Sequence, residues 1–265
     1  MQAEQSLQQG QPETALHQLQ DQIKKEPANP KLRVFLFQLL AVLGQWPRAL
    51  SQLKVAGDLD PANLLMVQTY REAIQCEALR TEIFVGKRSP LVFGEPQQWL
   101  AQLIQALSLE AAGHYEEASA LRMQAFEAAP ATTGSVNGCD FQWIADADTR
   151  LGPILEVIVN GCYYWVPFCR VSKIILEPPS DLRDMVWMPA HITWANGGDS
   201  VGLLPTRYPG SELASDPALS LGRKTEWLEP VTNEFHGLGQ RILTTDCADY
   251  SLCDIRELLL NPELT

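Results

Sequence analysis

Residues 155–168, LEVIVNGCYYWVPF, decide how the second half of this chain folds. An apolar run ends at Asn160-Gly161, and a run rich in aromatic and β-branched residues begins at Cys162. Both turn residues tolerate the positive φ angles of a type I′ turn, so Asn-Gly between two such runs is a strong local signal for a β-hairpin. The sequence therefore predicts two antiparallel strands joined by a two-residue turn.

Short β-rich segments continue on both sides of this hairpin. Because they are numerous and helical stretches are few, we expect a mostly antiparallel sheet from Cys139 onward. The preceding stretch ATTGSVNG, residues 131–138, contains small and turn-forming residues and is interpreted as a linker. The further predicted strands are residues 141–144, 171–176, 185–187, 191–194, 201–204, 241–245 and 255–260.

The first 130 residues carry an internal repeat with the 34-residue period of the tetratricopeptide repeat, a pair of helices joined by a tight turn. Glycine permits the turn, alanine allows close helix packing, and proline ends the second helix. The recurring residues are Gly10, Ala15, Leu16, Leu19 and Pro27, followed by Gly44, Ala49, Leu50, Leu53 and Pro61.

A third copy is expected at residues 113–130, where Gly113, Tyr115, Ala118 and Pro130 occupy the repeat positions. The unit before it is degenerate, because KRSPLVFGEP at residues 87–96 interrupts the helical pattern. The predicted helices are residues 2–9, 12–25, 31–43, 47–57, 62–84, 96–111 and 114–128.

The predicted fold class is therefore α+β, with N-terminal tetratricopeptide-like α-helical repeats followed by a mostly antiparallel α/β domain. We assign residues 1–130 to the repeat domain and residues 139–265 to the second domain. A length of 265 residues fits two domains better than one, and each half is expected to bury its own core.

Composition and charge narrow the range of possible functions. The net charge is −12, and most of it falls after residue 130, where nine Lys and Arg face eighteen Asp and Glu. An acidic surface repels phosphate backbones and anionic lipids, so neither nucleic acid nor membrane is an expected partner. The start MQAEQSLQQG lacks an export signal, so we expect a cytoplasmic protein. Its six cysteines form no CxxC pair and are expected to be reduced and mostly buried.

The helix predicted at residues 31–43 is apolar nearly all round, so both of its faces must be covered. One stripe packs inside the repeat stack, and a second stripe remains. Two interpretations stay open: the second stripe packs under neighbouring repeats or the second domain, or part of it lines a groove for a partner's amphipathic helix together with the next inner helix. The predicted partner-binding residues are Val34, Phe37, Gln38, Ala41, Val42, Leu65 and Gln68.

Several polar clusters suggest chemistry, and each has a structural alternative. Asp146 and Asp148 form a DxD pattern that suits a metal, but Arg150 beside them favours an internal ion pair or a turn cap. Arg207, in TRYPGS, either cradles an anion or, as we favour, anchors a Pro-Gly turn to an internal carboxylate. The four histidines are scattered and have no nucleophile motif nearby. We predict no catalytic, cofactor-binding or metal-binding residue.

Taken in order, these clusters resemble the ImpE family of accessory proteins of bacterial type VI secretion, whose members are also called TagJ or SciE. The resemblance covers most of residues 140–255, whereas the repeats match the family only in type. It is carried by DADTRLGPILEVIVNGCYYWVPF from Asp146, PSDLRDMVWMPAHITWANGGD from Pro179, LLPTRYPGSE from Leu203, RKTEWLEP from Arg223, and GLGQRILTTDCADYSL from Gly237.

The resemblance implies a cytoplasmic, non-catalytic adaptor without a cofactor. It implies binding to the small subunit of the contractile sheath, through a helical segment near that subunit's N-terminus, and an indirect connection with the ClpV-type ATPase that recycles contracted sheath. The family-motif residues have no role assigned by the resemblance; they are Asp146, Asp148, Arg150, Trp187, Trp194, Arg207, Tyr208 and Trp227.

A second function class stays open beside the adaptor. In this alternative the acidic half hydrolyses or modifies a small molecule, or binds one, with Asp146, Asp148 and Arg207 around it. Such chemistry needs a deep polar pocket that brings these three side chains together.

Overall fold

The repeat pattern produces a run of helices from Gln2 to Phe84. The computed structural model describes residues 2–95 and 97–262. Helices α1 (Gln2–Gln8) and α2 (Pro12–Lys25) pack as a pair, as do α3 (Pro30–Val42) and α4 (Trp46–Leu59). Proline lies in the first turn of α2, α3 and α4, and Gly10 and Gly44 take positive φ angles of 74° and 65° in the turns before α2 and α4. The predicted repeats are confirmed.

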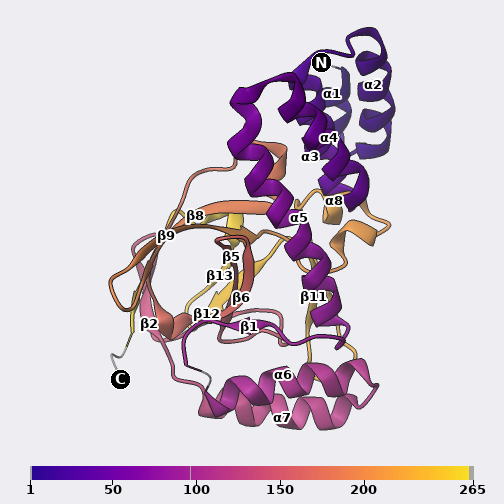
Figure 1. Ribbon diagram of the computed structural model, residues 1–265. Helices are drawn as coiled ribbons and strands as arrows, with labels where there is room; N and C mark the ends of the chain where they lie inside the picture. Colours follow the sequence, from indigo (N-terminus) through magenta and orange to yellow (C-terminus); the bar gives the residue numbers. More distant parts are fainter. Residues whose placement is uncertain (1, 96, 263–265) are drawn as a thin grey trace.

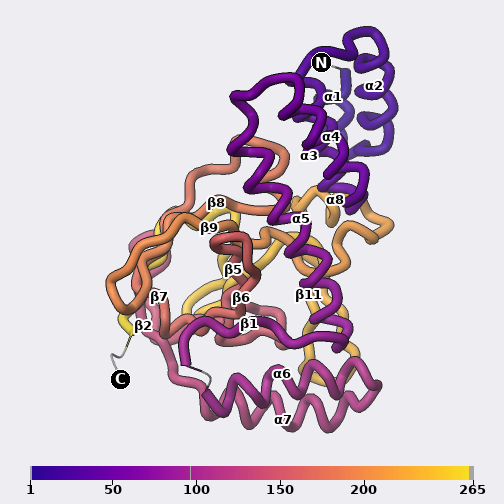
Figure 2. Tube along the Cα trace, in the orientation of Figure 1, coloured from indigo at the N-terminus to yellow at the C-terminus, as the bar shows by residue number. Residues whose placement is uncertain are grey.

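Helix α5 (Leu64–Phe84) follows a short 3-10 turn, η1 (Pro61–Asn63), and runs away from the repeat pairs across the molecule (Figures 1 and 2). Its 21 residues span about 32 Å. No helix within the described residues is both long and apolar enough to cross a membrane.

The third copy of the repeat forms a helix pair but does not stack on the first two. Helices α6 (Gln98–Ala111) and α7 (Tyr115–Ala128) pack together, with Gly113 in the turn between them. Figure 1 shows this pair at the opposite end of the molecule from α1 to α4, with α5 running between them. The segment that interrupts the pattern contains β1 (Leu91–Val92), which joins the sheet beside β6.

A nine-stranded sheet forms most of the second half, and its strands pair antiparallel except for β1 with β6. The predicted hairpin is confirmed, because β5 and β6 meet at Asn160 and Gly161 with φ angles of 50° and 73°. The strands, in order across the sheet, are β1, β6 (Cys162–Pro167), β5 (Ile154–Val159), β9 (Asp199–Pro205), β8 (Trp187–Trp194), β7 (Val171–Leu176), β14 (Glu257–Asn261), β2 (Thr133–Val136) and β3 (Cys139–Phe141).

Two smaller sheets complete this half. One contains β13 (Asp249–Ser251), β12 (Ile242–Thr245) and β4 (Ile144–Asp146), and the other is the ribbon of β10 (Thr225–Leu228) and β11 (His236–Gly239). The two strands predicted at 185–187 and 191–194 are one strand, β8, which begins after η3 (Leu182–Met185). The remaining short helices are η2 (Phe168–Arg170), η4 (Ser211–Leu213), α8 (Pro217–Ser220) and η5 (Leu252–Asp254).

The predicted linker at residues 131–138 is wrong. Residues Thr133–Val136 form β2, which lies between β14 and β3 in the large sheet. Gly134 is required for close strand approach, because a Cβ atom at this position would overlap the carbonyl oxygen of Leu259. A small residue that looks like a flexible connector is therefore held inside the sheet.

The prediction that each half buries its own core is also wrong. One core contains Phe37 and Tyr70 from the helices together with Trp165 and Trp187 from the sheet. The second core lies on the other side of the sheet, which curls round it in Figure 1. Strand β5 borders both cores, and for this reason all six of its residues are buried. Of the six cysteines, only Cys76 and Cys253 are buried, so the expectation of mostly buried thiols was wrong as well.

We expect the chain to unfold in a single cooperative transition, because its helices and its sheet share a core. Limited digestion with a protease of broad specificity should leave residues 133–136 intact, since β2 has paired strands on both sides. Thermal unfolding followed by circular dichroism, and mass spectrometry of the digest, test both points. Two transitions, or two stable fragments separated within residues 131–138, would contradict the shared core.

Candidate functional site

The motif that begins at Asp146 folds into a buried turn. The Asp148 carboxylate is fully buried and accepts hydrogen bonds from Arg150 Nε at 2.9 Å and from the backbone N–H of Gly237 at 2.9 Å. Burial acts to raise the pKa of Asp148, but Arg150 and the Gly237 N–H outweigh it and hold the pKa below its usual value. The predicted ion pair with Arg150 is confirmed. The described residues contain no cluster of three His, Cys, Asp or Glu side chains able to hold a metal.

Glu156 lies in the middle of β5 with no exposed surface. Arg80 of α5 forms a two-pronged ion pair with it, in which Nε lies 2.6 Å from Oε1 and Nη2 lies 2.8 Å from Oε2. Arg241 and the Tyr163 hydroxyl also donate to this carboxylate. Burial opposes ionisation, but the two guanidinium groups lower the pKa of Glu156 to about 2. Glu156 is therefore a buried, fully ionised centre.

Arg241 extends this buried network to the Asp146 turn. It pairs with Asp146 as well as with Glu156, and its Nε donates to the carbonyl of Pro205 at 2.8 Å. The Tyr208 hydroxyl donates to Asp146 Oδ1 at 3.0 Å. Burial outweighs the attraction of Arg241 and raises the pKa of Asp146 to about 7. We call Arg80, Asp146, Glu156 and Arg241 the ion network.

Glu77 adds a second contact between α5 and the sheet. It accepts a hydrogen bond from Trp187 Nε1 at 2.9 Å and lies 3.4 Å from Arg80 Nη1. Sequence reasoning missed Glu77, Arg80, Glu156 and Arg241. The available signal was Glu156, a single charge inside the apolar run LEVIV, because a charge in a strand covered on both faces requires a buried partner.

The contacts of Arg207 match neither of its two predicted roles, an anion cradle or an ion pair with an internal carboxylate. Its guanidinium donates to the carbonyls of Val42 at 2.8 Å and Ala41 at 3.4 Å, and also to the carbonyl of Ser220. It therefore caps the C-terminal end of α3 instead of pairing with a carboxylate or cradling an anion, and a cation is favourable at this end of a helix. Burial lowers the pKa of Arg207 to about 10.

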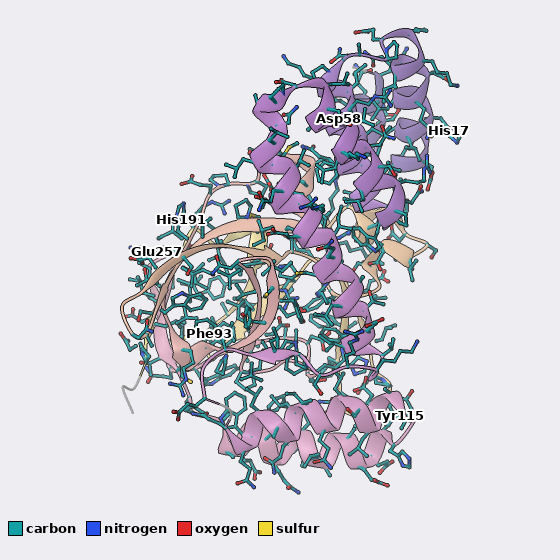
Figure 3. The ribbon with its side chains drawn as sticks, in the orientation of Figure 1. His17, Asp58, Phe93, Tyr115, His191 and Glu257 are labelled. Carbon is teal, nitrogen blue, oxygen red and sulfur yellow. The ribbon has the colours of Figure 1, made fainter. Side chains whose placement is uncertain are left out.

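Two of the three motif tryptophans connect the two halves of the chain. Trp187 packs against Trp46 and Tyr70, with ring centroids 5.9 and 5.7 Å away. Trp194 stacks on Phe93 at 4.2 Å, and Figure 3 shows Phe93 among the strands of the curled sheet. Trp227 is the exposed one, at 39%, and lies 5.6 Å from the ring of Tyr208. Most motif residues therefore build contacts inside the molecule.

The predicted groove on α3 is wrong, because its central residues are core. Phe37, Ala41 and Val42 have no exposed surface, and Gln38 is 6% exposed. Phe37 lies 5.7 Å from the ring of Tyr70, and Arg207 covers the end of the helix at Val42. The other interpretation, packing under neighbouring helices and the second half, describes the structure. Val34 is half-buried, while Leu65 and Gln68 on α5 are exposed.

The cleft that borders Asp146 does not suit the hydrolase alternative. A cleft of about 410 Å³ borders Asp146, but it is lined mainly by apolar side chains such as Phe126, Trp143 and Pro153. Neither Asp148 nor Arg207 lines this cleft, and both are engaged by other groups, Asp148 by Arg150 and Arg207 by the end of α3. The three side chains therefore form no common polar site.

Comparisons with known proteins agree with this organisation. The family model described as ImpE protein matches residues 138–259, and a tetratricopeptide repeat model matches residues 6–71. The chain is 54% identical over 263 residues to the type VI secretion system accessory component TagJ of Pseudomonas aeruginosa, covering 98% of this chain and 91% of that protein. It also resembles the crystal structure of protein VPA1032 from Vibrio parahaemolyticus, with a TM-score of 0.89, 26% identity and coverage of 100% of this chain and 99% of that one.

Replacing Arg241 by Met should lower the free energy of unfolding by about 3–5 kcal/mol, because Glu156 and Asp146 would lose a buried partner. The matched control is Lys173→Met, which removes a pair with Glu257 whose side chains are 42% and 40% exposed, and it should cost less than about 1 kcal/mol. Urea denaturation measures both. Equal effects of the two substitutions would show that the network contributes little.

Asp146→Asn should change how stability depends on pH. The pKa of Asp146 is about 7 when folded, against an ordinary value of 3.8, so its stabilising contribution is fully present below pH about 4 and is lost as the pH rises through 7. Asparagine does not titrate. The stability of the natural protein relative to the variant should therefore fall by a few kcal/mol between pH 4 and 8, at up to roughly 1.4 kcal/mol per pH unit. A constant or rising difference in urea denaturation would contradict a raised pKa.

Proposed function

This chain belongs to the ImpE family, and on that premise we propose that it is a non-catalytic adaptor of the type VI secretion system. In this role it binds the small subunit of the contractile sheath in the cytoplasm. The contact is made by a helical segment near the N-terminus of that subunit. The adaptor acts in the context of sheath recycling by a ClpV-type ATPase, which it contacts at most indirectly.

One observation carries the proposal: the polar motif residues are occupied by internal contacts. Asp148 binds Arg150, Asp146 binds Arg241 and Tyr208, and Arg207 caps α3. A catalytic site needs acid, base or nucleophilic groups that reach a substrate. These groups instead bind one another inside the second half, and Arg207 joins that half to α3, so what the molecule offers to a partner is its surface.

The repeats supply a further reason for a protein partner. Helical repeats expose extended surfaces to which amphipathic segments bind, and here two repeat pairs continue into a long helix whose first turns are exposed. The assignment to type VI secretion is supported by the similarity to an accessory component of that system over nearly the full chain. The proposed roles of the sheath subunit and of the ATPase are supported by the family resemblance alone.

The full-length protein should bind a synthetic peptide that covers the N-terminal helical segment of the small sheath subunit, with one peptide per chain at saturation. Isothermal titration calorimetry measures this, and burial of apolar surface should give a negative heat-capacity change. The control is a peptide of the same composition in scrambled order, which keeps the charge but has no apolar face. Equal binding of the two peptides, or no binding of either, would reject sheath recognition.

A further inference from the structure

One face of the large sheet continues beyond the area that α5 covers. Trp187 of β8 and Leu203 of β9 lie on this face and belong to the core shared with the helices. Alternate residues of a strand share a face, so Pro189, His191 and Val201 continue the same rows outward. Pro189 is opposite Leu203 and His191 is opposite Val201. All three outer residues are exposed, Val201 by 66%, and Figure 3 shows His191 at the surface.

Thr69 and Glu72 of α5 form the opposite wall, and Leu65 lies one helical turn before Thr69, just beyond this wall. Leu65, Thr69 and Glu72 are spaced four and three residues apart, so they lie along one side of the helix. Leu65 is 80% exposed. Glu72 reaches the hairpin turn, since a Cβ atom on Gly161 would lie 2.8 Å from its Oε2. The helix and the sheet therefore meet at the bottom of a trough.

The trough lies where β5 ends beside β9. The two strands pair at Ile158 and Leu203, and because β5 ends at Val159, the outer part of β9 extends past it. The resulting groove has a volume of about 260 Å³. Ile158, Val201 and Leu203 give it an apolar part, and Thr69, Glu72 and Asn160 a polar one. The other lining residues are Gly161 and Gly202.

Charge distinguishes this groove from a plain apolar patch. Glu72 lines it, and Asp199 lines the adjoining hollow that shares Val201. Among the described residues that line the two hollows there is no Lys or Arg. An apolar surface with carboxylates beside it is complementary to a segment that carries an apolar side chain next to a basic one.

We propose that this α5–β9 groove is the docking surface for an amphipathic helix, with an apolar side chain of the helix against Val201, a neighbouring Lys or Arg facing Glu72, and a further apolar contact with Leu65 beyond the end of the groove. The proposal rests on the adaptor function above, because the occupant it takes is the helical segment of the small sheath subunit. It adds the location of the contact and the requirement for a basic residue.

Two substitutions test the location, one in the groove on β9 and one on α5 a helical turn before the lining residue Thr69. Val201→Glu and Leu65→Glu each place a carboxylate where an apolar side chain of the peptide would be buried, so each should weaken binding of the sheath peptide at least about tenfold. Both sites are exposed, so the melting temperature should stay unchanged. The matched control is Leu213→Glu on η4, which is 83% exposed and lies on neither α5 nor β9, and it should bind like the natural protein.

A charge reversal tests the requirement for a basic residue. Glu72→Lys should weaken binding of the natural peptide. A second peptide, in which the Lys or Arg residues are replaced by Glu, should bind this variant more tightly than it binds the natural protein. Such reciprocal rescue occurs only if the two charges meet.

The outcomes separate the two proposals. If the natural protein does not bind the peptide, the adaptor function fails. If it binds, and Val201→Glu and Leu65→Glu bind equally well, the groove is wrong while the function stands. Light scattering adds a third result. If the natural protein is a dimer, and Val201→Glu dissociates it without affecting peptide binding, the groove binds a second copy of the chain. This result would overturn the proposal.

Discussion

The rest of the structure depends on a buried negative charge, that of Glu156, in the middle of a strand covered on both faces. An ionised carboxylate in such a place is strongly destabilising unless cations and hydrogen-bond donors surround it. Arg80 from the helices and Arg241 from the far end of the sequence supply the cations, and Tyr163 supplies a hydroxyl. Because the partners come from three distant parts of the chain, the helices and the sheet can satisfy this charge only together.

Features of the fold that are encoded locally could be predicted from the sequence. The helices follow from the spacing of Gly and Pro, and the hairpin follows from Asn160 and Gly161, because these residues act on their own turn. Features that depend on distant partners could not be predicted. Gly134 has the composition of a linker, yet it lies in a strand because Leu259 pairs closely with it. The position of the third repeat, away from the first two, depends likewise on where α5 leads the chain.

The candidate site shows the same difference between local contacts, which could be predicted, and distant contacts, which could not. Asp148 and Arg150 are only two positions apart in the sequence, and this proximity was enough to predict their ion pair. Arg207 was placed wrongly, because its partners are carbonyl groups at the end of α3, and any residue type supplies a carbonyl. The apolar helix at residues 31–43 required cover on both faces, but nothing in the sequence states that Trp187 and Tyr70 provide it. Exposure is a property of the assembled molecule, and only the structure distinguishes Leu65 from Phe37.

Helix α5 links the buried charges to the exposed surface. Its second half carries Glu77 and Arg80, which are fixed to Trp187 and Glu156, and its first half carries Leu65 and Glu72 on the outside. A helix anchored at one end by buried ion pairs cannot rotate about its axis without breaking them, so the side chains along its first turns keep a set direction. A surface that is already ordered loses little conformational entropy when a partner binds. In the adaptor role proposed above, such preorganisation favours binding, and buried residues such as Arg80 and Glu156 supply it.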